Sequence, residues 1–151
     1  RAEELTVRTN QLNSTGYTYS YEELDTFRRS RWHKLLIAEL EDKFGAYGKI
    51  GLVLLECGPS AWKIQLILMS CRVMSRGIGS ILLNYIIGRT QISKVKLFGE
   101  FVPTDRNRAM YIAYKFAGFR EVGREGNIII LESKIKEVPG IPYYVKLQSE
   151  F

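Results

Sequence analysis

The run Ser75-Arg76-Gly77-Ile78-Gly79 contains residue types that suit the binding of an anion. It joins an apolar segment to a stretch with helical periodicity, and the first N–H groups of a helix have no intrahelical partner. Glycine lets a phosphate group approach the backbone without meeting a Cβ atom, and Arg76 adds a positive charge. The run therefore predicts an anion site, with a tight strand-to-helix turn as the structural alternative.

A second group lies downstream and consists of Asn107, Tyr114 and the pair Gly118-Phe119. Tyr114 falls on one helical stripe with Met110 and Ala117, which is typical of a core residue. A phenol at the inner edge of a groove is also able to protonate a leaving thiolate. Both interpretations of Tyr114 stay open at this point.

A general base is harder to assign from the sequence. Glu100, Asp105 and Glu56 are candidates, although each is more typical of a solvated carboxylate than of a base. A chain of water molecules is a further alternative. Cys71 suggests covalent catalysis, but no paired histidine is recognisable because His33 is distant in sequence, so a small buried cysteine is favoured.

The composition fits one soluble domain with an anionic partner. The 151 residues are enough for one sizeable core, and no apolar run is long enough to span a bilayer. A net charge of +6 suits either a solvated surface or an acidic partner, such as a nucleotide-like cofactor or a carrier protein. We expect no nucleic acid, because no zinc-finger or RNA-binding signature is present.

Cysteine and histidine usage bounds the chemistry further. Two cysteines and one histidine, widely spaced, are too few for a disulfide scaffold or a zinc site. With no signal peptide visible, we expect a cytoplasmic protein that holds no metal and contacts no membrane.

The predicted order of elements that must position these residues is helix, three strands, helix, strand, helix, strands. Ser20 and Glu23 are spaced as a capping box for a helix ending near Arg31. The helix after Gly77 is predicted to bury Ile78, Ile81, Leu82, Tyr85 and Ile86. Residues 107–117 predict another helix that ends at Gly118. The apolar segments that predict strands are residues 33–41, 50–56, 62–69, 94–101 and 127–133, with 143–147 as a further candidate.

This order predicts an α+β fold, with a mixed, mostly antiparallel sheet flanked by helices. It does not fit a run of βαβ repeats. We divide the chain into a polar lead-in, residues 1–19, and one domain, residues 20–151.

The glycine turn and the Asn107 group together resemble the GNAT superfamily of N-acetyltransferases. Its cofactor loop commonly reads Gln or Arg, two residues, Gly, one residue, and Gly or Ala. Here Met74 stands at the first position and Gly77 and Gly79 at the last two. The later GNAT motif, an Asn, a Tyr seven residues on and then Gly-Phe, is matched at Asn107, Tyr114 and Gly118-Phe119. The resemblance covers residues 21–133.

A narrower resemblance, to the FkbH-like family, covers four further segments. Members pair an N-terminal HAD-type domain with a C-terminal GNAT-like domain, and they load a three-carbon glyceryl unit onto an acyl carrier protein in polyketide pathways. The HAD motifs are absent from this sequence, so the resemblance covers only the C-terminal half of such a protein. The segments are Arg8 to Asn13, Asp42 to Gly45, Ser70 to Val73 and Phe101 to Thr104.

The resemblance implies direct acyl transfer from coenzyme A, as acetyl-CoA, or from a phosphopantetheine thioester. The pantetheine arm would lie between the strand ending at Ser70-Cys71 and the strand ending near Gly99-Glu100. A backbone amide near residues 69–71 would polarise the thioester carbonyl, Tyr114 would protonate the sulfur, and Glu100 is the weaker candidate base. The residues implied to bind the cofactor are Met69, Ser70, Cys71, Ser75, Arg76, Gly77, Ile78, Gly79, Asn107 and Tyr114.

Three functional hypotheses follow. The first is an acyltransferase whose partners are an acyl carrier protein and an N-terminal HAD-type domain. The second is a non-catalytic module of the same fold that docks the carrier protein for the HAD domain, which Met74 and the unassigned base favour. The third is a free-standing small-molecule acetyltransferase.

Overall fold

One mixed sheet forms the centre of the protein. The computed structural model describes residues 14–15, 19–70, 77–138, 140 and 146–147, with the side chain of Ile78 left out. Within these residues the sheet has six strands in the order β1-β2-β3-β4-β6-β5. They are β1 (His33–Asp42), β2 (Gly45–Cys57), β3 (Ala61–Met69), β4 (Lys96–Phe101), β5 (Phe119–Glu125) and β6 (Ile128–Ser133). All neighbouring pairs are antiparallel except β3 and β4, which confirms the predicted α+β fold.

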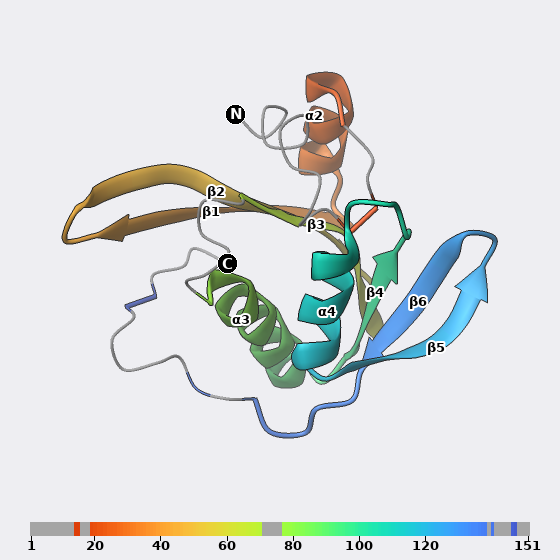
Figure 1. Ribbon diagram of the computed structural model, residues 1–151. Coiled ribbons are helices and arrows are strands. Elements are labelled where there is room, and N and C mark those ends of the chain that lie inside the picture. The colour runs from red at the N-terminus through yellow and green to blue at the C-terminus, as the bar shows by residue number, and fades with distance from the viewer. Residues whose placement is uncertain (1–13, 16–18, 71–76, 139, 141–145, 148–151) are drawn as a thin grey trace.

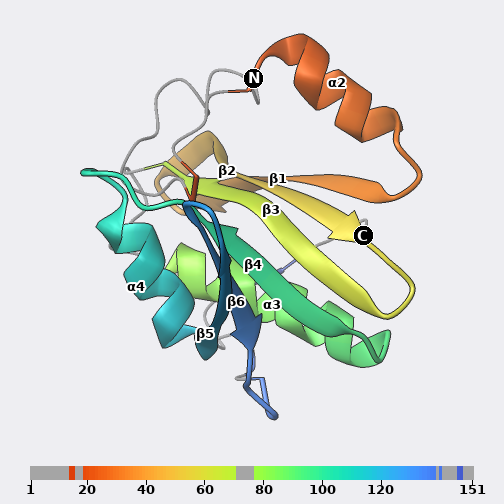
Figure 2. The ribbon, with the colours of Figure 1, turned by 90° about the vertical axis from the view of Figure 1, so that its right-hand side faces the viewer.

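Helices cover both faces of the sheet. Helix α2 (Tyr21–Arg29) lies on one face, and α3 (Ile78–Ile92) and α4 (Arg108–Phe116) lie on the other (Figures 1 and 2). Alternate residues of β2 point to opposite faces, so Val53 and Leu55 join the core under α3 and α4 while Leu52 and Leu54 pack toward α2. Burial on both faces explains why the central strands read as continuous apolar runs.

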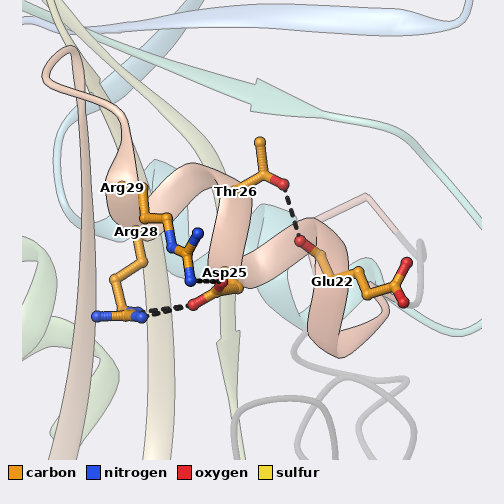
Figure 3. Close-up of polar contacts among 5 residues, drawn as sticks. All are labelled: Glu22, Asp25, Thr26, Arg28 and Arg29. Carbon is orange, nitrogen blue, oxygen red and sulfur yellow. Dashed lines mark hydrogen bonds and ion pairs between the residues drawn. The ribbon is translucent and has the colours of Figure 1, made fainter.

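Helix α2 begins as the sequence predicts. Ser20 Oγ accepts a hydrogen bond from the Glu23 N–H at 3.1 Å, and Glu23 Oε1 accepts one from the Ser20 N–H at 3.3 Å. Asp25 lies within 2.6 Å of Arg28 and 3.1 Å of Arg29, which keeps these charges along the exposed side of the helix (Figure 3). The helix ends at Arg29, two residues before the predicted end.

The buried side of α3 is only partly the predicted one. Ile86 is buried as predicted, and Leu82 and Tyr85 pack against the core while remaining partly exposed. The residues buried without having been predicted are Leu83, Ile87 and Thr90. The helix is apolar around much of its circumference, so periodicity alone does not select the side that faces the sheet. For α4 the stripe is confirmed, because Met110, Tyr114 and Ala117 are all buried.

Two strand predictions were incomplete. Strand β5 was missed because only Phe119 of its residues is buried, so this edge strand carries no alternating apolar pattern. Strand β2 begins at Gly45 rather than Ile50. Residues 143–145 of the further candidate strand lie outside the described residues, and Lys146 and Leu147 belong to no strand.

Candidate functional site

The sheet opens where β3 and β4 diverge. Their parallel pairing runs from Ala61↔Lys96 to Ile64↔Gly99 and stops there, although β3 continues to Met69. A β-bulge explains the divergence: Leu54 pairs with Leu66 but Leu55 pairs with Ile64, which leaves Gln65 as an extra residue in β3. Beyond the bulge, the edge of β3 that faces β4 must find hydrogen-bond partners other than β4. We call this opening the splay.

Ser14 occupies the splay. Its N–H donates to the Ile67 carbonyl at 2.9 Å, and its Oγ accepts from the Ile67 N–H at 3.0 Å. Its carbonyl accepts from the Val102 N–H at 2.8 Å, just past the end of β4. Ser14 is fully buried, so a residue from the predicted lead-in bridges β3 and the end of β4 beyond the point where these two strands stop pairing.

Tyr114 of α4 lies at the splay on the face of the sheet that α3 and α4 cover. Its ring packs against Phe119 at a centroid distance of 5.0 Å and against the bare backbone of Gly99, the last β4 residue paired with β3. The side chain is completely buried, and its hydroxyl has no hydrogen bond of ordinary geometry among the described residues. The sequence left a core role and a site role open; the burial and the ring packing confirm the core position, and the site role stays a prediction.

The protonation of Tyr114 follows from this enclosure. Burial is the main cause that raises its pKa, because a phenolate loses its hydration. The nearby Ser14 hydroxyl opposes the shift, and the negative charge of Glu100 adds to it. The net effect holds the pKa well above its usual range, so the hydroxyl keeps its proton at neutral pH.

Asn107 shapes the loop between β4 and α4. It is fully buried, its Oδ1 accepts from the Thr104 N–H at 2.8 Å, and its Nδ2 donates to the Val102 carbonyl at 2.8 Å. Since Val102 also bonds to Ser14, Asn107 is linked to the splay through one residue. These two hydrogen bonds hold the loop, and the cofactor contact of Asn107 stays a prediction.

Gly77 begins α3 with a left-handed φ of 70°, which glycine adopts without strain. Among the described residues, no side chain caps this helix start, no acidic residue lies in its first turn, and no atom lies within 4 Å of a Cβ built at Gly77 or Gly79. A helix start of this kind favours anions, and anion binding at the two glycines stays a prediction. The predicted site residues Cys71, Ser75 and Arg76 lie outside the described residues.

The backbone N–H groups of Met69 and Ser70 point to opposite edges of β3. Met69 is buried in the core beneath α3 and α4. The Ser70 N–H donates to the Ile50 carbonyl at 2.7 Å, so it is directed at β2 and away from the splay. Because backbone groups alternate along a strand, the Met69 N–H faces the same side as that of Ile67. Among these predicted residues, Met69 is the one whose amide is directed toward the splay.

The candidate bases lie elsewhere. Glu100 alternates with Gly99 along β4, so its side chain is on the opposite face of the sheet from Tyr114. There it pairs with Lys63 at 3.6 Å. Glu56 accepts a hydrogen bond from Gln65 at 2.8 Å, and Asp105 is exposed. The structure therefore does not bring any of the three beside the Tyr114 hydroxyl.

Two further findings concern metal ligands and membrane-spanning helices. In the part of the chain that the structure describes, no group of three His, Cys, Asp or Glu side chains is placed to hold a metal ion. None of the described helices has the length and apolar character needed to cross a membrane.

Sequence reasoning missed Ser14, Gln65 and Ile67. A polar turn segment and two strand residues carry no local signal that they meet in space.

No family model and no curated protein matches the sequence. Solved structures do match the fold. A GNAT family acetyltransferase from Elizabethkingia anophelis with acetyl-CoA bound is 18% identical with a TM-score of 0.58, over 77% of this chain and 84% of that one. The ribosomal-protein-S18-alanine N-acetyltransferase of Escherichia coli is 13% identical with a TM-score of 0.65, over 90% and 88%.

A third match is the N-acetyltransferase PseH of Campylobacter jejuni in complex with acetyl coenzyme A. It is 17% identical with a TM-score of 0.54, over 72% of each chain. At these identities the likeness concerns the fold. The chain has the GNAT acetyltransferase fold, as the pairing of the glycine turn with Asn107 and Tyr114 predicts.

Proposed function

We propose that this GNAT-fold chain is an acyltransferase domain that binds acetyl-CoA or another pantetheine thioester in the splay between β3 and β4. The observation that carries the proposal is the buried, protonated Tyr114 hydroxyl, which lies without a hydrogen bond of ordinary geometry where the two strands separate. Two of the matching structures, from Elizabethkingia anophelis and Campylobacter jejuni, have acetyl-CoA bound on the same fold.

The backbone around the splay fits an extended amide-containing arm. Ile67 directs both its N–H and its carbonyl into the opening, and Val102 directs its N–H there from the other side. A pantetheine arm carries amide groups that match such donors and acceptors. The uncapped start of α3 at Gly77 suits the phosphates of the same cofactor, because helix N-termini favour anions.

The chain's own groups then divide the work of acyl transfer. The bound thioester supplies an activated acyl group and a thiolate leaving group. An amine attacks the carbonyl carbon, a carbon–nitrogen bond forms and the carbon–sulfur bond breaks. Tyr114 donates its proton to the departing sulfur, and the amide of Met69 or Ile67 stabilises the charge on the carbonyl oxygen.

Glu100 is the base in this scheme. It lies on the face of the sheet opposite Tyr114, beside Lys63, so an amine that approaches from that face would pass its proton to Glu100. This assignment rests on the position of Glu100 one residue after Gly99, the last β4 residue paired with β3.

The wider setting follows the FkbH-like resemblance. In it the chain is the C-terminal part of a cytoplasmic protein that supplies three-carbon units to an acyl carrier protein in polyketide biosynthesis, together with an N-terminal HAD-type domain. A net charge of +6 suits an acidic carrier protein as well as coenzyme A.

A second candidate function is a non-catalytic module that docks the acyl carrier protein for the HAD domain. Ser14 favours it, because this residue already occupies the splay. The separation of Glu100 from Tyr114 by the sheet favours it as well. The free-standing small-molecule acetyltransferase remains a third candidate, with no observation of its own.

Calorimetric titration with acetyl-CoA separates the first candidate from the second. We expect saturable binding below about 1 mM, an affinity typical of a cofactor site. Absence of heat and of thermal stabilisation at several millimolar cofactor would exclude the acyltransferase and leave the docking module.

A further inference from the structure

Ser14 takes the place in the sheet that a ligand of the splay needs. It comes from a segment 53 residues away from Ile67, yet it satisfies both backbone groups of Ile67 and the N–H of Val102. These are the same three groups that the proposed function assigns to the thioester arm.

The Ile67 N–H cannot form a full hydrogen bond to Ser14 and to a thioester arm at the same time. Each backbone N–H carries a single proton, and the Ile67 N–H already gives its proton to Ser14 Oγ at 3.0 Å. Ser14 is also fully buried, so its atoms fill the space between Ile67 and Val102 that an arm would need. An arm in the splay and Ser14 in its observed position therefore exclude each other.

We propose that Ser14 is an intrachain competitor of the thioester arm, and that the cofactor binds only when Ser14 withdraws from the splay. The inference rests on the proposed function and adds regulation to the same site. The structure is the closed form, in which Ser14 reproduces the hydrogen bonds of a ligand. Anything that holds Ser14 itself away from the sheet would raise cofactor affinity.

In the cofactor-free protein the closed form predominates under this proposal. Hydrogen bonds from Ser14 are replaced by hydrogen bonds from the arm, so the competition lowers the observed affinity by the fraction of molecules in the open form. Weakening one Ser14 contact should therefore tighten binding of the cofactor by about threefold to tenfold, the value of one hydrogen bond.

The test compares Ser14→Ala with wild type and with Thr26→Ala as a matched control. Ser14→Ala removes the acceptor of the Ile67 N–H and leaves the backbone contacts of residue 14. Thr26→Ala removes a hydroxyl of exposed α2 that donates to the Glu22 carbonyl at 2.9 Å, remote from the splay. Calorimetry with acetyl-CoA should give tighter binding for Ser14→Ala only.

Three outcomes separate the inference from the proposed function. Tighter binding by Ser14→Ala, with Thr26→Ala like wild type, supports both. Equal affinity for all three proteins overturns the competition and leaves the acyltransferase. Binding by none of them at several millimolar cofactor overturns the acyltransferase and the inference with it.

Hydrogen exchange of the wild-type amides gives a readout that needs no variant. The Ser14 N–H is protected in the closed form by the Ile67 carbonyl. Saturating acetyl-CoA should speed its exchange by at least about tenfold, because the bond opens. The Val95 N–H, bonded to the Thr90 carbonyl at 3.0 Å, serves as the internal control and should not change. A Ser14 amide that stays protected in the complex overturns the competition.

Discussion

The ring of Tyr114 lies directly on the backbone of Gly99, with no side chain between α4 and β4 at this point. A Cβ atom at Gly99 would come 2.8 Å from Cε1 of Tyr114 and 3.0 Å from its Cζ and hydroxyl oxygen. Packed carbon atoms do not approach so closely. The bare backbone of Gly99 is therefore what lets the phenol reach the place where β3 and β4 separate.

Gly99→Ala should destabilise the protein, because the added methyl group displaces the buried ring. We expect a loss of about 1–3 kcal/mol in the free energy of unfolding, the cost of overpacking a core. Urea denaturation measures it. Gly88→Ala is the matched control: Gly88 lies within α3 with open space at its Cβ, so alanine should stabilise by about 0.5–1 kcal/mol. Equal effects of the two substitutions would contradict the packing.

Tyr114→Phe should separate catalysis from stability. The phenol oxygen has no hydrogen bond of ordinary geometry among the described residues, so its removal should leave the unfolding free energy unchanged or slightly higher. Thioester turnover, followed by release of free thiol, should fall roughly 100-fold, as expected for loss of a general acid. Cofactor affinity should stay within twofold of wild type, which corresponds to a change of at most about 0.4 kcal/mol in the binding free energy. Weaker binding with unchanged turnover would argue against the acid role.

Stability should fall in alkaline solution because of the same residue. Burial raises the folded-state pKa of Tyr114 above that of the unfolded chain, so the folded protein keeps a proton that the unfolded chain loses. The stabilisation is complete below the unfolded pKa of about 10 and declines as the pH rises above it. Urea midpoints between about pH 9 and 11 should drop more steeply for wild type than for Tyr114→Phe. Parallel pH profiles would show that Tyr114 is not the group responsible.

Asn107→Ala should loosen the loop that leads from β4 to α4. The substitution removes two partly buried hydrogen bonds of 2.8 Å, from the Thr104 N–H and to the Val102 carbonyl, and each such bond contributes about 0.5–1.5 kcal/mol. Thermal unfolding without cofactor measures the loss. If Asn107 served only the cofactor, the variant would melt like wild type and lose affinity alone.

Arg76→Glu tests the carrier-protein hypothesis. A basic residue beside the glycine turn should attract an acidic carrier protein in a salt-dependent manner. We expect the substitution to weaken carrier binding by roughly tenfold at low salt, with a smaller effect at high salt. Surface plasmon resonance at two ionic strengths measures both. Unchanged binding would remove Arg76 from the interface.

Much of the architecture was predictable because it depends on local patterns. The capping box of Ser20 and Glu23 needs only residues three apart, and the buried stripe through Met110 and Tyr114 needs only helical spacing. Strand β5 escaped prediction because an exposed edge strand need not alternate, and the buried side of α3 was predicted only in part because most of that helix is apolar.

The sequence by itself determined the α+β order, the glycine turn at the start of α3 and the presence of a tyrosine on the inner stripe of α4. Only the tertiary structure decided what surrounds that tyrosine. The bulge at Gln65 opens β3 from β4, Gly99 lets the ring approach, and Ser14 enters the gap from far along the chain. These are contacts between residues distant in sequence, and they form because backbone groups at a broken strand pairing must find partners wherever the fold supplies them.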